Sequence, residues 1–187
     1  VPLYAYWTFS PRGGDLQRRL YLHIAEHLGA AFDGRVLDVG TGNGMLAVHL
    51  ALRHPRAFIV GVDTWSAKWE YGKSTCERNA GIADVSDRAT YQHGNAAELP
   101  FETGAFDAVV SNLTFHEVPH ARSCTALVIE ALRVLKPGSP FVFIDLFYDT
   151  RLYGSGSTLT ERLKADGVTD LSLRPLSAVL PIPWVLN

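Results

Sequence analysis

The sequence predicts a single doubly wound α/β domain, in which a mostly parallel sheet is covered by helices on both faces. Continuous apolar runs of strand length recur along the chain, and segments with helical periodicity separate them. Strands that are apolar at successive positions are typical of a parallel sheet buried on both sides. The length of 187 residues fits one domain, and there are no repeats or long linkers to divide it.

The core of this domain is expected at residues 35–147. Its five predicted strands are residues 35–40, 57–63, 89–94, 106–112 and 140–147. The helices predicted between and after them are residues 44–53, 66–80, 119–135 and 155–167, the last capped by Ser157 or Thr158. Residues 1–34 precede the core. In this segment Leu16, Leu20, Ile24 and Leu28 recur at helical spacing, which predicts an extra helix on the sheet.

The segment after the core, residues 148–187, predicts an unusual end to the sheet. Residues 168–176 favour a sixth strand. Pro181 and Pro183 interrupt the remaining apolar segment, so a seventh strand is expected to be missing or reduced to a short edge contact. The apolar end, with Trp184 as anchor, and the apolar start VPLYAYWTF suggest proximity to a membrane or to a second copy of the chain.

Composition excludes several classes of partner. A net charge of −2 and a pI near 6.4 give no basic footprint for nucleic acid. Cys76 and Cys124 lack metal-type spacing, so no metal site and no disulfide framework are expected. Without an apolar run of membrane-spanning length or a signal peptide, a cytoplasmic setting is expected, with membrane association only if an anchor precedes Val1.

The stretch VLDVGTGNGMLAVHL, residues 36–50, carries the strongest functional signal. Glycines between a strand and a helix let a ligand approach the backbone at the carboxyl end of a parallel sheet. Gly42, Gly44 and Ala47 also satisfy the G-x-G-x-x-A form of the dinucleotide fingerprint. Asp38 argues against a dinucleotide, because its carboxylate would repel a pyrophosphate. It would attract the amino group and sulfonium of S-adenosyl-L-methionine (SAM).

LDVGTGNG resembles motif I of the class I SAM-dependent methyltransferases, and further motifs occur in order along the chain. VGVDTW is similar to the second motif, HGNAAELPF to the third and FDAVVSNLTFHEV to the fourth. ALRVLKPGSPFVFIDLF is similar to the next helix and strand. The resemblance runs from about Arg35 to Leu146 and is nearest in character to the small-molecule, ubiquinone-biosynthesis-like group.

The resemblance implies a role for each matching residue. Gly40, Thr41, Gly42 and Gly44 would line the methionine and ribose of SAM, and Asp38 would contact the methionyl amine directly or through water. Asp63 would accept both ribose hydroxyls, with Thr64 beside it. Asn95 stands where the family usually has aspartate, and its amide oxygen can accept from the adenine amino group. The N–H of Ala96 would address the adenine ring.

The end of the fourth strand is expected to lie beside the sulfonium methyl. Ser111 and Asn112 close that strand, Ser111 as a cofactor-binding residue and Asn112 as a candidate catalytic residue. Asn112 lacks the two prolines that come after it in amino-group methyltransferases of nucleic acids, which disfavours that chemistry. His116 and Glu117 come next, as a candidate general base and its partner. Methyl transfer from a sulfonium needs positioning and exclusion of water rather than a metal or a covalent nucleophile.

The acceptor is expected to be a small apolar or aromatic molecule. Four aromatic residues near the start are candidates for a lid over it, or for packing onto the first helix: Tyr4, Tyr6, Trp7 and Phe9. Two alternatives remain open, namely a SAM-binding module without catalytic activity and, less favoured, an NAD(P)-dependent oxidoreductase.

Overall fold

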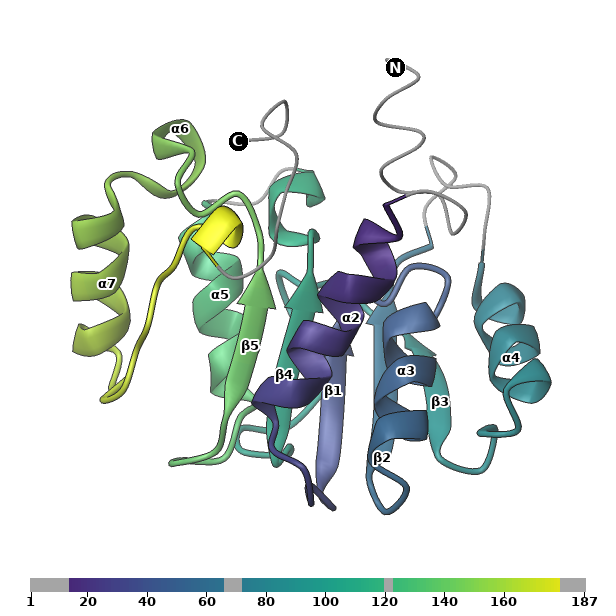
Figure 1. Ribbon diagram of the computed structural model, residues 1–187. Coiled ribbons are helices and arrows are strands. Elements are labelled where there is room, and N and C mark those ends of the chain that lie inside the picture. Colours follow the sequence, from purple (N-terminus) through teal and green to yellow (C-terminus); the bar gives the residue numbers. More distant parts are fainter. Residues whose placement is uncertain (1–13, 66–71, 120–122, 179–187) are drawn as a thin grey trace.

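The computed structural model describes residues 14–65, 72–119 and 123–178 and places a five-stranded parallel sheet at their centre (Figure 1). The strands are β1 (Arg35–Val39), β2 (Phe58–Asp63), β3 (Ala89–His93), β4 (Ala108–Asn112) and β5 (Phe141–Ile144). Their order in the sheet is β3-β2-β1-β4-β5, so the chain reverses direction across the sheet at β1. The predicted doubly wound fold is confirmed.

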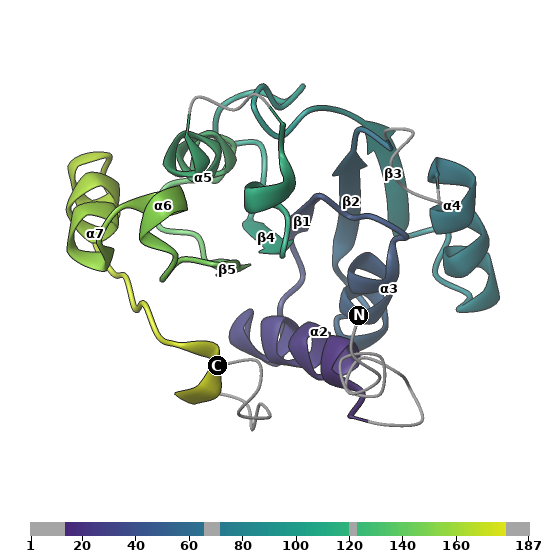
Figure 2. The same ribbon diagram turned by 90° about the horizontal axis from the view of Figure 1, so that it is seen from above.

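Two layers of helices cover the sheet. α2 (Leu16–His27), α3 (Met45–Arg53) and α4 (Lys73–Ile82) pack on one face, and α5 (Cys124–Arg133), α6 (Thr150–Tyr153) and α7 (Gly156–Ala165) lie on the other (Figure 2). Successive residues of β1 alternate between the two cores, with Val36 facing the first layer and Leu37 the second. Both are completely buried, which explains why β1 is apolar at consecutive positions.

The predicted N-terminal helix is confirmed as α2. Leu16, Leu20 and Ile24 are buried along one side of it, as the helical spacing of these leucines and isoleucine requires. The helix crosses the sheet near β4 and β5 and packs against α3. It therefore brings its own residues close to the carboxyl ends of the central strands.

Several predicted boundaries are wrong, and a capping hydrogen bond explains two of them, those at Ser123 and Ser155. α4 begins at Lys73, because Gly72 is extended. The helix predicted from Pro119 begins instead at Cys124, where the Ser123 side chain accepts from the N–H of Ala126. A short 3₁₀ turn, η1 (Phe115–Glu117), comes directly after β4. The cap of α7 is Ser155, and neither Ser157 nor Thr158.

The region after α7 also differs from expectation. Residues 168–175 form no strand, and only a 3₁₀ turn, η2 (Leu176–Ala178), comes after them in the described residues. β5 is the last strand of the described sheet and ends at Ile144 rather than at residue 147. The predictions for Trp184, for the two late prolines and for the aromatic residues at the start fall outside the described residues.

Candidate functional site: a cavity at the carboxyl ends of the strands

A cavity of about 580 Å³ opens where β1, β2 and β4 end. Its position is the switch point of the sheet, where open α/β folds bind their ligands. Most predicted cofactor residues line it: Asp38, Gly40, Thr41, Gly42, Asp63, Thr64, Asn95 and Ala96. The catalytic candidate Asn112 lines it too. Gly44 and Ser111 are not among its lining residues, and neither is His116.

The glycine loop between β1 and α3 is held by its own amide groups. The N–H groups of Gly40 and Thr41 both donate to the carbonyl oxygen of Val62, at 2.8 and 3.1 Å. Gly42 donates to the Asp63 carboxylate at 2.9 Å, and Gly44 donates to the carbonyl of Thr41. These amides of the glycine loop therefore already have partners within the chain.

Gly40 is the position where the loop needs glycine. Its φ is +73°, in the left-handed region that favours glycine. A Cβ built there would lie 2.1 Å from both Cγ2 and Oγ1 of Thr114. The Thr114 hydroxyl donates to the carbonyl of Val39 at 3.1 Å, which fixes the start of η1 against the loop.

Asp38 is a carboxylate without solvent contact. Thr41 Oγ1 donates to its Oδ2 at 2.7 Å, whereas Oδ1 is buried without a hydrogen-bond partner in the described structure. Burial raises the pKa of Asp38 to about 7, and the nearby Asp63 adds to that rise, against the Thr41 bond that lowers it. Asp38 Oδ1 therefore lacks a compensating cation or donor, and a ligand cation at the cavity would supply one.

Asp63 ends β2 and organises the opposite wall. Its Oδ2 accepts from Gly42 and its Oδ1 accepts from the N–H of Trp65, each at 2.9 Å. Each carboxylate oxygen can accept a second bond. The Trp65 indole N–H donates to the carbonyl of Gly42 at 2.9 Å, so Trp65 braces the loop from outside the cavity.

The residues that come directly after β3 form another wall of the cavity. Asn95 and Ala96 line the cavity, and the side-chain oxygen of Asn95 accepts from the N–H of Ala97 at 2.9 Å. This side-chain oxygen of Asn95 is the atom predicted to accept from the adenine amino group. A carbonyl oxygen can accept two hydrogen bonds, so the contact with Ala97 leaves room for that donor. Ser111, at the end of β4, donates to the carbonyl of Val39 at 2.9 Å and is completely buried.

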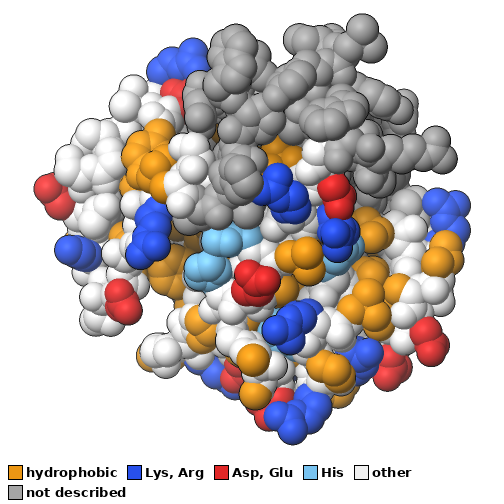
Figure 3. All heavy atoms as spheres, viewed as in Figure 1, with side chains coloured by type: hydrophobic (Ala, Val, Ile, Leu, Met, Phe, Trp, Pro, Cys, Tyr) orange, Lys and Arg blue, Asp and Glu red, His pale blue; other side chains and the backbone are white. Residues whose placement is uncertain are grey.

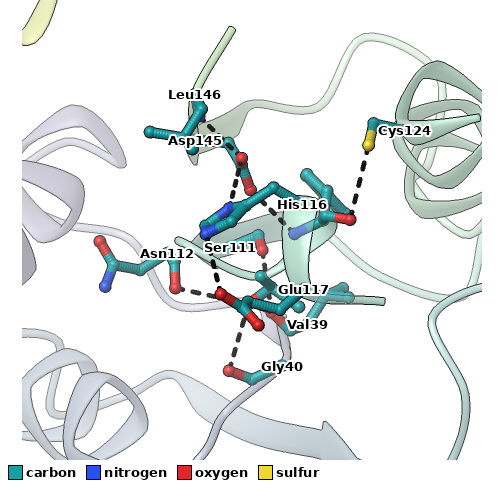
Figure 4. Close-up of polar contacts among 11 residues, drawn as sticks. Val39, Gly40, Ser111, Asn112, His116, Glu117, Cys124, Asp145 and Leu146 are labelled. Carbon is teal, nitrogen blue, oxygen red and sulfur yellow. Dashed lines mark hydrogen bonds and ion pairs between the residues drawn. The ribbon is translucent and has the colours of Figure 1, made fainter. Parts of the chain in front are cut away.

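Beyond β4, an imidazole lies between two carboxylates (Figure 4). His116 Nδ1 lies 2.8 Å from Asp145 Oδ1, and its Nε2 lies 3.4 Å from Glu117 Oε1. The Asp145 side chain is fully buried, and it also accepts from the N–H groups of Phe115 and Leu146 at 2.8 and 2.7 Å. Of the three side chains, only Glu117 lines the cavity.

Sequence reasoning missed three contributors to the site. Gln17 and Tyr21 reach the cavity from α2, and their side chains are joined by a 2.6 Å hydrogen bond. Their spacing of four residues was a signal for a shared helix face, but nothing in the sequence showed which way that face points. Asp145 falls inside the predicted fifth strand, whereas it lies just after β5 and supports His116.

No group of three or more His, Cys, Asp or Glu side chains in the described ranges is arranged to hold a metal ion. In the same part of the chain, no helix combines the length and apolar character needed to cross a membrane.

Comparison with known families identifies the domain type. Residues 36–138 match the family model described as a methyltransferase domain. The chain is 30% identical to the O-methyltransferase rstn1 of Aspergillus nomiae over 147 residues, which are 77% of this chain and 62% of that protein. It is 34% identical to the ubiquinone/menaquinone biosynthesis C-methyltransferase UbiE of Bartonella henselae over 117 residues, covering 62% of this chain and 42% of the relative.

Among solved structures, the [4+2]-cyclase SpnF is similar, with a TM-score of 0.63 and 26% identity, covering 80% of this chain and 56% of that one. The chain thus spans between about two fifths and three fifths of the length of these proteins. The similarities bear out the resemblance drawn from the motifs and the Rossmann-like fold of class I methyltransferases.

Proposed function

This chain belongs to the methyltransferase-domain family, and on that premise we propose that it transfers a methyl group from SAM to a small apolar or aromatic molecule. The relatives named above are an O-methyltransferase and a C-methyltransferase according to their names, so the family alone does not select one acceptor. The choice of cofactor rests on the cavity itself.

The observation that carries the proposal is the engagement of the glycine loop amides. A dinucleotide site presents free N–H groups of this loop and of the adjoining helix to a pyrophosphate. Here Gly42 donates to Asp63, and the N–H of Met45, at the start of α3, donates to the side chain of Asn43 at 3.3 Å. The Gly42 amide is therefore engaged by a carboxylate rather than free for a phosphate, which argues against NAD(P).

The same cavity fits the chemistry of SAM. Asp38 Oδ1 and Asn112 Oδ1 are buried acceptors without a donor in the described residues, and Asp63 has spare acceptor capacity. SAM carries an ammonium group, a sulfonium and two ribose hydroxyls, which are cations or donors. We assign the methionine end of SAM to Asp38 and Gly40, the ribose to Asp63, and the adenine to Asn95 and Ala96, with Thr41, Gly42 and Thr64 beside them.

When bound, SAM supplies an activated methyl group for an in-line displacement. The residues of the chain then have to align the acceptor and exclude water. Leu113 and Val118 line the cavity after β4, and Tyr21 lines it from α2. These apolar and aromatic surfaces support a small apolar or aromatic acceptor.

Calorimetry tests the cofactor directly. The protein is titrated with SAM, S-adenosylhomocysteine and NADH under the same conditions. Binding of SAM and S-adenosylhomocysteine with dissociation constants on the order of micromolar is expected, or about −8 kcal/mol, without binding of NADH. Binding of NADH with no response to SAM would overturn the proposal.

Nucleic acid is not among the proposed acceptors. On the face seen in Figure 3, positively and negatively charged side chains are interspersed. The net charge of −2 supports the same view. RNA or DNA binding that weakens steeply with salt would contradict this part of the proposal.

A second candidate function is SAM binding without methyl transfer. The similarity to a protein described as a cyclase favours it, since one fold hosts different chemistries. Transfer of a labelled methyl group to acceptors from a metabolite extract separates the two, because a binding module leaves every acceptor unlabelled.

The proposed setting is the cytoplasm, supported by the free thiols of Cys76 and Cys124. A membrane or a second copy of the chain as partner of the apolar ends stays a prediction. Light scattering and liposome binding test it.

A further inference from the structure

Glu117 is the one side chain of the His116 cluster that lines the cavity. It lies beyond β4 on the same wall as Asn112 and Thr114, and 56% of its side chain is exposed. His116 lies behind it, with 17% of its side chain exposed. A ligand in the cavity would therefore meet the carboxylate before the imidazole.

The hydrogen bonds of Asp145 orient the His116 ring. The carboxylate of Asp145 already accepts two backbone N–H groups, so it acts as an acceptor toward its other neighbours as well. The short contact with His116 then requires a hydrogen on Nδ1. The remaining ring nitrogen, Nε2, faces Glu117 and can take or return a proton there (Figure 4).

We propose that Glu117 is the catalytic base that touches the acceptor, with His116 and Asp145 as positioning residues behind it. This reverses the roles that the sequence suggested for His116 and Glu117, and it rests on the proposed function. A base in this place selects an acceptor that must lose a proton, so the structure assigns a hydroxyl or amine as the methylated group.

The step balances without another reactant. The O–H or N–H bond of the acceptor breaks, and its proton passes to the Glu117 carboxylate. The electron pair left on the oxygen or nitrogen forms the new bond to the methyl carbon, and the bond from that carbon to sulfur breaks with its electrons kept by sulfur. The proton then moves from Glu117 to His116 Nε2 or to solvent, and Asp145 stabilises the protonated ring.

The test uses sinefungin, an analogue that carries an amine where SAM carries the sulfonium and its methyl group. If Glu117 faces the transferred methyl, the ammonium of sinefungin lies against its carboxylate. Dissociation constants for sinefungin and S-adenosylhomocysteine are measured by calorimetry on the wild type, Glu117→Gln and Glu161→Gln. Glu161 is an exposed glutamate on α7 and serves as the matched control.

The wild type is expected to prefer sinefungin over S-adenosylhomocysteine. Glu117→Gln reduces that preference about fivefold, the range of a charge pair that is partly exposed, and Glu161→Gln leaves it unchanged. A preference that survives Glu117→Gln overturns the inference while leaving the proposed function intact. If neither sinefungin nor S-adenosylhomocysteine binds the wild type, the proposed function itself is wrong.

A second measurement follows the His116 ring. Nitrogen-15 spectra recorded over a pH series are expected to show the hydrogen on Nδ1 wherever the ring carries a single hydrogen. Asp145→Asn is expected to shift the hydrogen toward Nε2, a change that a merely structural contact would not require. A neutral ring with its hydrogen on Nε2 in the wild type contradicts the arrangement.

Discussion

The imidazole of His54 donates from Nε2 to the carbonyl oxygen of Ala25, 3.0 Å away, and so ties the end of α3 to α2. The residue is 1% exposed, and Phe32 packs against the ring edge-on. Its Nδ1 has no hydrogen-bond partner among the described residues. The neutral ring fits this place, whereas a protonated ring would bury a second donor without an acceptor.

Acid is expected to weaken the attachment of α2. Burial lowers the pKa of His54, and the nearby Arg53 adds to the effect against the bond to Ala25. The unfolded chain therefore takes up this proton first, so the stabilisation is present above about pH 6.5 and is lost as the pH falls through the folded-state pKa. Thermal unfolding at pH 7.5 and 5.5 measures it in the wild type and in His54→Gln.

Other groups also titrate between pH 7.5 and pH 5.5. The test therefore compares the acid-induced fall in unfolding temperature of each variant with that of the wild type. His54→Gln is expected to unfold at a lower temperature at pH 7.5 and to lose less on acidification. His93→Gln, at the exposed end of β3, is the control. An equal acid-induced loss in wild type and His54→Gln would show that His54 is not responsible.

SAM affinity is expected to depend on the ionisation of Asp38. Its pKa is raised to about 7 chiefly by burial, so at pH 5 the free protein holds a proton that a cationic ligand must displace. Over two pH units this competition lowers the affinity about 100-fold. Calorimetry at pH 8 and pH 5 measures the change. Asp38→Asn should bind weakly at both values and lose the pH dependence.

The same carboxylate destabilises the free fold at high pH. A folded-state pKa above the unfolded value means that Asp38 contributes least once the pH has risen through about 7. Asp38→Asn is expected to raise the free energy of unfolding at pH 8 by a few kcal/mol and to change it little at pH 4. Urea unfolding without ligand measures both, and a variant less stable than wild type at pH 8 would refute a destabilising role for the buried charge.

Gly40→Ala tests the close approach between the glycine loop and η1. The substitution combines a left-handed backbone with a Cβ placed 2.1 Å from Thr114, and about 3 kcal/mol of stability should be lost. Gly138→Ala is the matched control, because Gly138 has a φ of +78° but nothing within 4 Å of its added Cβ. A loss of about 1 kcal/mol is expected there. Similar losses in the two variants would show that the contact is unimportant.

Asp63→Ala should weaken SAM binding more than it weakens the fold. The variant leaves two ribose hydroxyls and the Gly42 amide without their acceptor, a loss of about 2–4 kcal/mol in binding. Asp87→Ala, an exposed aspartate, is the control. Unchanged SAM affinity in Asp63→Ala would assign Asp63 to loop structure alone.

The parts of the fold that depend on local sequence were predicted well. The apolar runs located β1 and β2 to within one or two residues, because burial on both faces requires apolar side chains at consecutive positions. Boundaries set by a single hydrogen bond were missed, as at Ser123, which caps α5. Such a bond depends on backbone angles that residue type alone does not determine.

In the functional site, too, the residues marked by local sequence were predicted, whereas contacts that depend on packing were not. The family resemblance predicted that Asp38 and Asp63 belong to one SAM site. Both line the cavity, because parallel strands bring their carboxyl ends to one edge of the sheet. The partnership of His116 with Asp145 joins residues 29 apart, through the end of β4 and the turn after β5. Only the packed structure shows that Asp145 contacts the His116 ring and that Glu117 lines the cavity.

The position of β1 between β2 and β4 has a consequence for biosynthesis. Val39 pairs with Ser111, which is made 72 residues later. At bacterial or eukaryotic rates of translation, this delay is roughly 4–14 seconds. During that interval the nascent chain displays an apolar strand with one unpaired edge, a surface on which chaperones and aggregation compete. The cavity cannot yet form in this intermediate, since Asn112, which lines it, has not been synthesised.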